Sequence, residues 1–446
     1  MFYYNVRWAF KLPDNCSVSI PGGIIAASAV PQHGLIRRRF GKFPHLQHRL
    51  FDPQLYLGGL SADRSRKAVV KLSSYGWFSP PDVPSYDSSI HGKQADWTNT
   101  FQQQILEAWR GSTRRSPAEI AVAARAAVQL QVDLECDAII LPSPLTNTLT
   151  TSYEDELAWL DAGLEACVEL RVRSPIYATV AISDVALRGL DPQQNTVLSL
   201  ISDQVSARGV AGAYIVIEQA SEDGYVCGDE NTLYSLLQLV DDFTRGARLD
   251  TIVNYAGTFG AVAAAAGAKI WSSGYYLGQR KLRLSEFEAE EEDVRLAYPR
   301  YYSLALAGDV GLRGSLDALN AGGFERAVFS KTDASQPLHD ALSSGAKVDD
   351  VATWTYRASN ITAAAAHYND TVAKLGGFLH RLSQPDRVEF VHKWLCRAVE
   401  LSRELHSNGF RSSHHTELSH QAAWLRAFER WRDGTIGGGS TPNPGA

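Results

Sequence analysis

The sequence has few of the features that mark metal sites, secretion or membranes. Its cysteines form no CxxC or CxH pair of the kind that structural zinc requires, because they stand far apart: Cys16, Cys136, Cys167, Cys227 and Cys396. The first residues, MFYYNVRWAFKLPDN, lack the basic start and apolar run of a secretory signal peptide. No stretch approaches about 20 uninterrupted apolar residues, the length that spans a bilayer. We therefore expect reduced thiols, no membrane segment and a cytoplasmic protein.

Motifs for common cofactors and nucleophiles are also missing. No GxGxxG or GxxxxGK[ST] follows a predicted strand, no GxSxG is present, and no HxH or HExxH occurs. The twelve histidines avoid the predicted strand ends. His414, His415 and His420 could collect a metal, but a solvated helix start is the preferred interpretation. We expect neither a metal nor a cofactor.

The negative net charge argues against a protein that binds nucleic acid through its overall electrostatic potential. The chain has 43 basic and 49 acidic residues, a net charge of -6. Local basic groups occur at 37–39 with Lys42, and at Arg110 with Arg114 and Arg115, and we interpret them as solvated loop charges. Hydrophobic residues make up 45% of the chain, which is enough for a large core.

Alternating apolar runs and helical patterns predict an α/β fold, a (β/α)₈ barrel of the TIM type with an appended C-terminal helical region. Within each predicted strand the apolar residues follow one another without intervening polar residues. This pattern is typical of parallel strands that are covered on both faces by helices. A doubly wound sheet is the alternative, and the absence of a nucleotide-binding glycine motif favours the barrel. Eight strands are predicted, at 50–57, 68–77, 136–144, 176–183, 212–219, 250–257, 268–274 and 327–330.

Composition along the chain divides it into four parts. We expect an irregular or β segment at 1–49 that packs on the barrel, the barrel at 50–335, and a mainly helical region at 336–435. The glycine- and proline-rich end, 436–446, is predicted to be a flexible tail. An acidic run at 286–300 is interpreted as a solvated face near the last barrel unit.

The active sites of such barrels lie at the C-terminal ends of the strands, which selects a ring of polar residues. These are Asp52, Gln54, Lys71, Ser73, Ser74, Tyr75, Ser143, Asn147, Ser183, Asp184, Glu218, Gln219, Asn254, Tyr255, Ser272, Ser273, Tyr275 and Arg280.

Two carboxylates in this ring are the candidate catalytic residues. Glu218 directly follows the apolar run AYIVI, so we expect poor solvation to raise its pKa into a range suited to general acid or base catalysis. The alternative is a structural ion pair with Lys71 or Arg280. Asp52 precedes Pro53, which favours an extended geometry that could aim the carboxylate at the pocket, although an Asx turn is equally consistent.

The candidate substrate-binding residues are Gln54, Ser143, Gln219, Asn254, Tyr275 and Arg280. Gln219, Asn254 and Tyr275 could hydrogen-bond a nucleobase or sugar, and Arg280 could hold a phosphate or carboxylate. Four aromatic residues could stack on a planar ligand or belong to the core: Trp77, Trp271, Tyr255 and Tyr276.

The order of features over about residues 50–285 resembles the tRNA-guanine transglycosylase-like barrels. The resemblance rests on LFDPQLYLGG, on CDAIILPSP followed by a helix with Trp159, and on DTIVNYAGTFGAVAAAAGAKIWSSGYYLGQR. It implies exchange or excision of a purine-like base, with Asp52 matching the base-handling aspartate. The position of the family's nucleophilic aspartate falls near Ser272 or Ser273 in this chain. The family's Cys/His zinc signature is absent.

Three functions therefore remain open. The first is an enzyme that acts on the C–N glycosidic bond of a nucleobase- or nucleoside-like substrate, small or derived from nucleic acid. The second is another metal-independent barrel enzyme, a lyase, isomerase or hydrolase. The third is a non-catalytic barrel that binds a protein partner or a second copy of itself through the C-terminal helices.

Overall fold

A computed structural model describes most of the chain. The described residues are 1–6, 20–32, 34–35, 46–78, 109, 115–149, 153–188, 196–220, 226–288, 299–355, 361–410 and 418–437. Several predicted features lie outside these ranges: the basic group at 37–39 with Lys42, Arg110 and Arg114, His414, His415 and the tail beyond residue 437.

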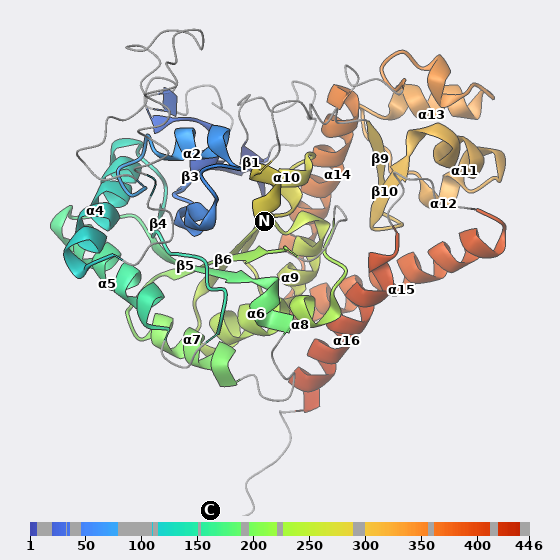
Figure 1. The fold of residues 1–446 in the computed structure, drawn as a ribbon. Coiled ribbons are helices and arrows are strands. Elements are labelled where there is room, and N and C mark those ends of the chain that lie inside the picture. The colour runs from blue at the N-terminus through green and yellow to red at the C-terminus, as the bar shows by residue number, and fades with distance from the viewer. Residues whose placement is uncertain are drawn as a thin grey trace, which may run out of the picture.

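Eight parallel strands form a nearly closed barrel, which confirms the predicted fold class (Figure 1). The strand order is β3-β2-β1-β8-β7-β6-β5-β4, and a backbone hydrogen bond of 3.0 Å from Asp137 N to Arg49 O joins the edges at β3 and β4. The strands are β1 (Phe2–Val6), β2 (Gly22–Ala26), β3 (His48–Asp52), β4 (Ile139–Ile140), β5 (Ile176–Ser183), β6 (Gly212–Glu218), β7 (Asp250–Asn254) and β8 (Ile270–Ser273).

Two of the predicted strands are wrong, and the N-terminal segment replaces them. The run at 68–77 forms helix α2 (Arg66–Leu72) and a turn, because Ala68, Val69 and Leu72 bury one helical face. Part of the run at 327–330 belongs to α12 (Glu325–Val328). The segment 1–49, predicted to pack on the barrel, instead contributes β1 and β2 to the barrel sheet itself.

Helices cover the outside of the barrel, as the unbroken apolar strands require. Helix α4 begins after Ser116, since Ser116 and Glu119 form a capping box around Pro117. The other helices of this layer and of the strand ends are α5 (Glu154–Glu169), α6 (Asp184–Arg188), α7 (Thr196–Ser206), α8 (Glu230–Asp241), α9 (Gly260–Ala266) and α10 (Leu277–Arg280), with α4 spanning Pro117–Asp133.

The chain after the barrel begins with an antiparallel hairpin of β9 (Arg300–Ser303) and β10 (Gly308–Gly311). Short helices follow, among them α11 (Asp317–Ala321) and α13 (Gln336–Ser343). Three long helices then complete the described chain: α14 (Ile361–Arg381), α15 (Gln384–Ser407) and α16 (His420–Gly437).

The long helices lie along one side of the barrel (Figure 1). Helix α14 packs on β1, α15 on α9, and α16 on α8. Two polar contacts join α14 and α16 to the barrel. Ser273 Oγ lies 2.9 Å from Tyr368 Oη of α14, and Trp424 Nε1 of α16 donates to Cys227 O at 2.7 Å. They therefore form part of the barrel's outer layer. Among the described helices, none is long and apolar enough to cross a membrane.

Gly212 at the start of β6 tests the packing of the barrel interior. A Cβ at this position would lie 2.3 Å from Asp250 O and 2.5 Å from the Tyr177 ring, so Gly212→Ala must displace a strand backbone. We expect a loss of about 1–3 kcal/mol in the free energy of unfolding, measured with urea. Gly246→Ala is the matched control, because a Cβ there meets nothing within 4 Å. Equal stability of the two variants would contradict this packing.

Candidate functional site

Asp52 lies at the centre of a buried polar network inside the barrel. Asp52 is the last residue of β3, and its carboxylate has no exposed surface. Oδ2 accepts hydrogen bonds from Tyr56 Oη at 2.5 Å, Tyr214 Oη at 2.7 Å and Asn254 Nδ2 at 3.3 Å. Oδ1 accepts from the backbone N–H of Gln54 at 3.0 Å. Four donors from the protein therefore satisfy this carboxylate.

The network continues from Asn254 to the neighbouring strands. Asn254 Oδ1 accepts from Asn5 Nδ2 at 3.1 Å on β1, from the backbone N–H of Tyr255 at 2.7 Å, and from Ser272 Oγ on β8. Gln54 Nε2 donates to Tyr255 Oη at 2.7 Å. Side chains from β1, β3, β6, β7 and β8 thus meet across the barrel interior.

Burial shifts the titration of Asp52. Desolvation raises the pKa of its carboxyl group from 3.8 to about 6, although the hydrogen bonds from Tyr56, Tyr214, Gln54 and Asn254 act in the opposite direction. The predicted Asx-type contact is present, since Oδ1 of Asp52 accepts from the N–H two residues on. This geometry supports a structural role, and a catalytic role for Asp52 stays a prediction.

Glu218 occupies a different environment, beside a cavity of about 310 Å³ at the C-terminal ends of β5 and β6. We call this space the Glu218 cavity. It is lined by Asn147, Ser183, Val185, Glu218, Ala220, Leu284, Ser285 and Glu288. Its position at the C-terminal ends of the strands is where barrel enzymes bind their substrates.

Neutral groups hold the Glu218 carboxylate. Ser183 Oγ donates to Oε2 at 3.0 Å, and the backbone N–H of Leu284 donates to Oε1 at 3.4 Å. Burial raises the pKa of Glu218, with the hydrogen bonds and nearby Arg283 opposing and Asp184 adding to the shift. The alternative partner Arg280 is instead paired with Asp309.

The segment after α10 closes one side of the Glu218 cavity. Leu282 pairs with the end of β6, where the backbone N–H of Gln219 donates to Leu282 O at 2.9 Å. The chain then forms the 3-10 turn Leu284–Phe287 and brings a second carboxylate, Glu288, to the cavity. Glu288 is more exposed and lies 3.9 Å from Arg64 Nη1.

Gln219, Asn254 and Arg280 line a separate, much smaller space. Its volume is about 20 Å³, room for a single water molecule. Gln219 Oε1 and Arg280 Nη2 are buried there without a hydrogen-bond partner in the described part of the chain. The structure therefore brings these three predicted residues together, but not around the Glu218 cavity.

Arg280 and Tyr275 connect the barrel to the β9–β10 hairpin. Arg280 forms a buried ion pair with Asp309 of β10, and its guanidinium lies 3.9 Å from the centre of the Tyr368 ring. Tyr275 Oη accepts from the backbone N–H of Arg300 at 2.8 Å. These contacts give Arg280 a protein carboxylate as its partner, where the sequence suggested a phosphate or carboxylate of a ligand.

The remaining predicted residues fall outside the Glu218 cavity. Ser143 is buried, and its hydroxyl donates to Pro144 O at 3.4 Å. Lys71 belongs to α2, not to a strand end. Trp77 donates to Pro53 O at 2.9 Å and is buried like Trp271, which supports the core interpretation of both.

Sequence reasoning found part of the Glu218 cavity and missed the rest. Asn147, Ser183 and Glu218 belong to the predicted ring. Ser285 and Glu288 do not: Glu288 belongs to the acidic run that was interpreted as a solvated face, and Ser285 directly precedes that run. Their place directly after the last strand of the barrel, β8, and its short helix was the available signal.

No protein-family model matches the chain, and no curated protein matches it. The resemblance to transglycosylase-like barrels therefore stays a prediction, and the site must be interpreted from its own geometry.

Asp52→Asn tests the buried carboxyl. Because the native pKa is raised, the folded state holds the proton more tightly, so the wild type loses stability as pH rises from the unfolded pKa of 3.8 through about 6. The asparagine variant cannot titrate at this position. We expect the stability difference, wild type minus variant, to fall by about 2 kcal/mol between about pH 4 and pH 7 in urea unfolding. A difference that is constant with pH would contradict the assignment.

Proposed function

We propose that the protein is a barrel enzyme that cleaves the C–N glycosidic bond of a nucleobase- or nucleoside-like substrate bound in the Glu218 cavity. The observation that carries this proposal is a buried carboxyl with a raised pKa, held by neutral donors, at a cavity on the C-terminal side of the strands. A carboxyl group whose acid form is favoured by burial is suited to act as a general acid.

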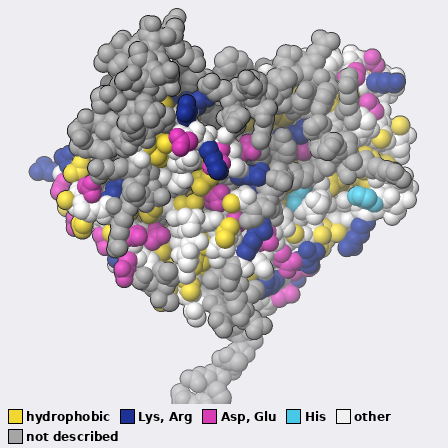
Figure 2. Space-filling view, viewed as in Figure 1, with side chains coloured by type: hydrophobic (Ala, Val, Ile, Leu, Met, Phe, Trp, Pro, Cys, Tyr) yellow, Lys and Arg dark blue, Asp and Glu magenta, His cyan; other side chains and the backbone are white. Residues whose placement is uncertain are grey.

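The lining of the cavity favours a substrate without a phosphate. It presents two carboxylates, two serine hydroxyls and the Asn147 amide, and none of the eight lining residues that the structure describes is Lys or Arg. Such groups donate to and accept from a base or a sugar, whereas the Glu288 carboxylate repels an anion. On the face in Figure 2, acidic and basic side chains of the described residues are interspersed. This mixed surface favours a small nucleoside over a polynucleotide.

The proposed reaction uses the two carboxylates in different roles. Glu218, in its acid form, donates a proton to the leaving nitrogen as the C–N bond breaks. A water molecule attacks the sugar carbon, and the Glu288 carboxylate takes the proton that this water loses. The products are the free base and the free sugar, and proton exchange with solvent restores both carboxyl groups.

Direct hydrolysis is favoured over exchange through a covalent aspartyl intermediate. Ser272 and Ser273 stand where the resemblance places the nucleophilic aspartate. Ser272 Oγ donates to Asn254, and Ser273 Oγ contacts Tyr368. Neither side chain is a carboxylate. The mechanism therefore relies on water as the nucleophile.

Glu218→Gln tests the catalytic assignment. The amide keeps the shape of the side chain but has no proton to give, so we expect the rate of nucleoside hydrolysis to fall by about 100-fold or more, while nucleoside binding is retained. In the wild type, the rate should fall as pH rises through the raised pKa of Glu218, because the acid form is lost. The measurements are base release against pH and calorimetric binding of a set of nucleosides.

Two further variants locate the site. Glu165→Gln removes an exposed carboxylate on α5 and should leave rate and binding unchanged. Ser285→Trp places a large ring at an exposed position of the cavity lining and should abolish nucleoside binding. If Ser285→Trp binds nucleosides like the wild type, or if Glu218→Gln hydrolyses them at the wild-type rate, the proposal is wrong.

A further inference from the structure

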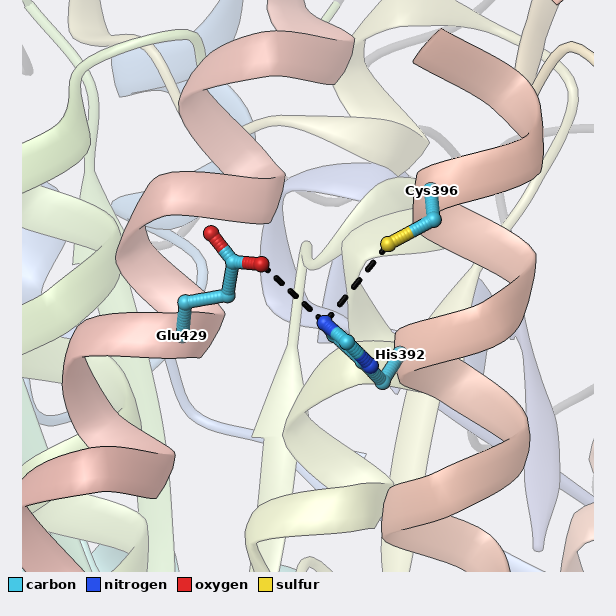
Figure 3. A group of neighbouring side chains, drawn as sticks. All are labelled: His392, Cys396 and Glu429. Carbon is cyan, nitrogen blue, oxygen red and sulfur yellow. Dashed lines mark hydrogen bonds and ion pairs between the residues drawn. The ribbon is translucent and has the colours of Figure 1, made fainter. Parts of the chain in front are cut away.

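Three side chains of different chemistry converge between the last two long helices, α15 and α16 (Figure 3). His392 and Cys396 stand one turn apart on α15, and Glu429 faces them from α16. His392 Nε2 lies 3.0 Å from Glu429 Oε1 and 3.5 Å from Cys396 Sγ. All three potential ligand atoms lie within 4.8 Å of one another.

These separations match a tetrahedral metal site. Zinc bonds of about 2.0–2.1 Å to nitrogen, about 2.0–2.2 Å to oxygen and about 2.3 Å to sulfur place neighbouring nitrogen and oxygen ligands about 3.3 Å apart, and nitrogen and sulfur ligands about 3.6 Å apart. The distances of 3.0 Å and 3.5 Å are close to these values. For these two pairs a metal ion would need only small side-chain adjustments, and the Cys396 sulfur and the Glu429 oxygen already lie within 4.8 Å of each other.

The donor set selects the kind of metal. One imidazole nitrogen, one thiol sulfur and one carboxylate oxygen suit a borderline-soft ion such as Zn²⁺, whereas Mg²⁺ and Ca²⁺ require oxygen ligands. The site is partly open, since the side chains of His392 and Glu429 are 23% and 39% exposed. A water molecule can therefore supply a fourth ligand.

We infer that His392, Cys396 and Glu429 form a zinc site that links α15 to α16. Both helices cover the outside of the barrel, α15 on α9 and α16 on α8. Bound zinc would fix the two helices to each other and so stabilise this outer layer. The site is independent of the Glu218 cavity and of the proposed hydrolysis.

Cobalt(II) gives the sharpest test, because a thiolate ligand produces a sulfur-to-cobalt charge-transfer absorption. The full-length protein, reduced and treated with a chelator, is titrated with Co²⁺ and then with Zn²⁺. We expect one equivalent of Co²⁺ to produce the absorption and Zn²⁺ to remove it by displacement. Zn²⁺ should also raise the melting temperature, whereas Mg²⁺ should not.

Variants assign the signal to this trio. Cys396→Ser should lose the charge-transfer absorption, and His392→Ala and Glu429→Gln should weaken Zn²⁺ binding by about 100-fold or more, since even an outer-sphere partner commonly contributes 10–100-fold. Two changes serve as controls and should bind like the wild type: His406→Ala, an exposed histidine on the same helix, and Cys167→Ala, a buried cysteine on α5.

Two experimental results would contradict the zinc site. An absence of the absorption with one equivalent of Co²⁺ in the wild type would show that the trio is only a hydrogen-bonded His–Glu pair beside a thiol. Zn²⁺ binding that survives in both Cys396→Ser and His392→Ala would place the metal elsewhere. Either result overturns the inference, and neither depends on whether the protein hydrolyses a nucleoside.

Discussion

The hydrogen bonds to the buried carboxylate of Asp52 are the constraint around which the barrel interior is arranged. A carboxylate without exposed surface is costly unless donors surround it, and here Tyr56, Tyr214, Asn254 and the backbone of Gln54 do so. Because the donors come from different strands, satisfying one charge also fixes the positions of those strands relative to one another. Polar groups in a barrel core in this way add specificity to the packing.

The same network divides the end of the barrel where substrates bind. Around Asp52 the tyrosine side chains fill the interior, so the carboxylate contacts protein groups. On the side of β5 and β6, Ser183 and Glu218 border a cavity instead. The division explains why two carboxylates that both end apolar strands have different environments. It also explains why the proposed chemistry uses Glu218 with Glu288, and not the pair that the sequence suggested.

The sequence predicted the fold class well because the long central strands are unbroken apolar runs, a pattern that survives without structural context. It failed at β1 and β2, which lie outside the alternating strand and helix patterns that marked the barrel, and at α2, whose apolar run is compatible with either a strand or a helix. Glu218 was found from its position at a strand end. The network of Asp52 was not, because Asn5, Tyr214 and Ser272 meet only after the barrel closes.

The two candidate carboxylates differ in the number of hydrogen bonds that they accept from the protein. A carboxylate has about four lone-pair positions. Asp52 receives four hydrogen bonds, so a substrate would have to displace one of them. From the residues that the structure describes, Glu218 receives two, from Ser183 and Leu284, and it borders the cavity. Its remaining positions are available to a substrate group or a proton, and burial favours the proton. Glu218 can therefore exchange a proton with a ligand without breaking a contact on which the barrel depends.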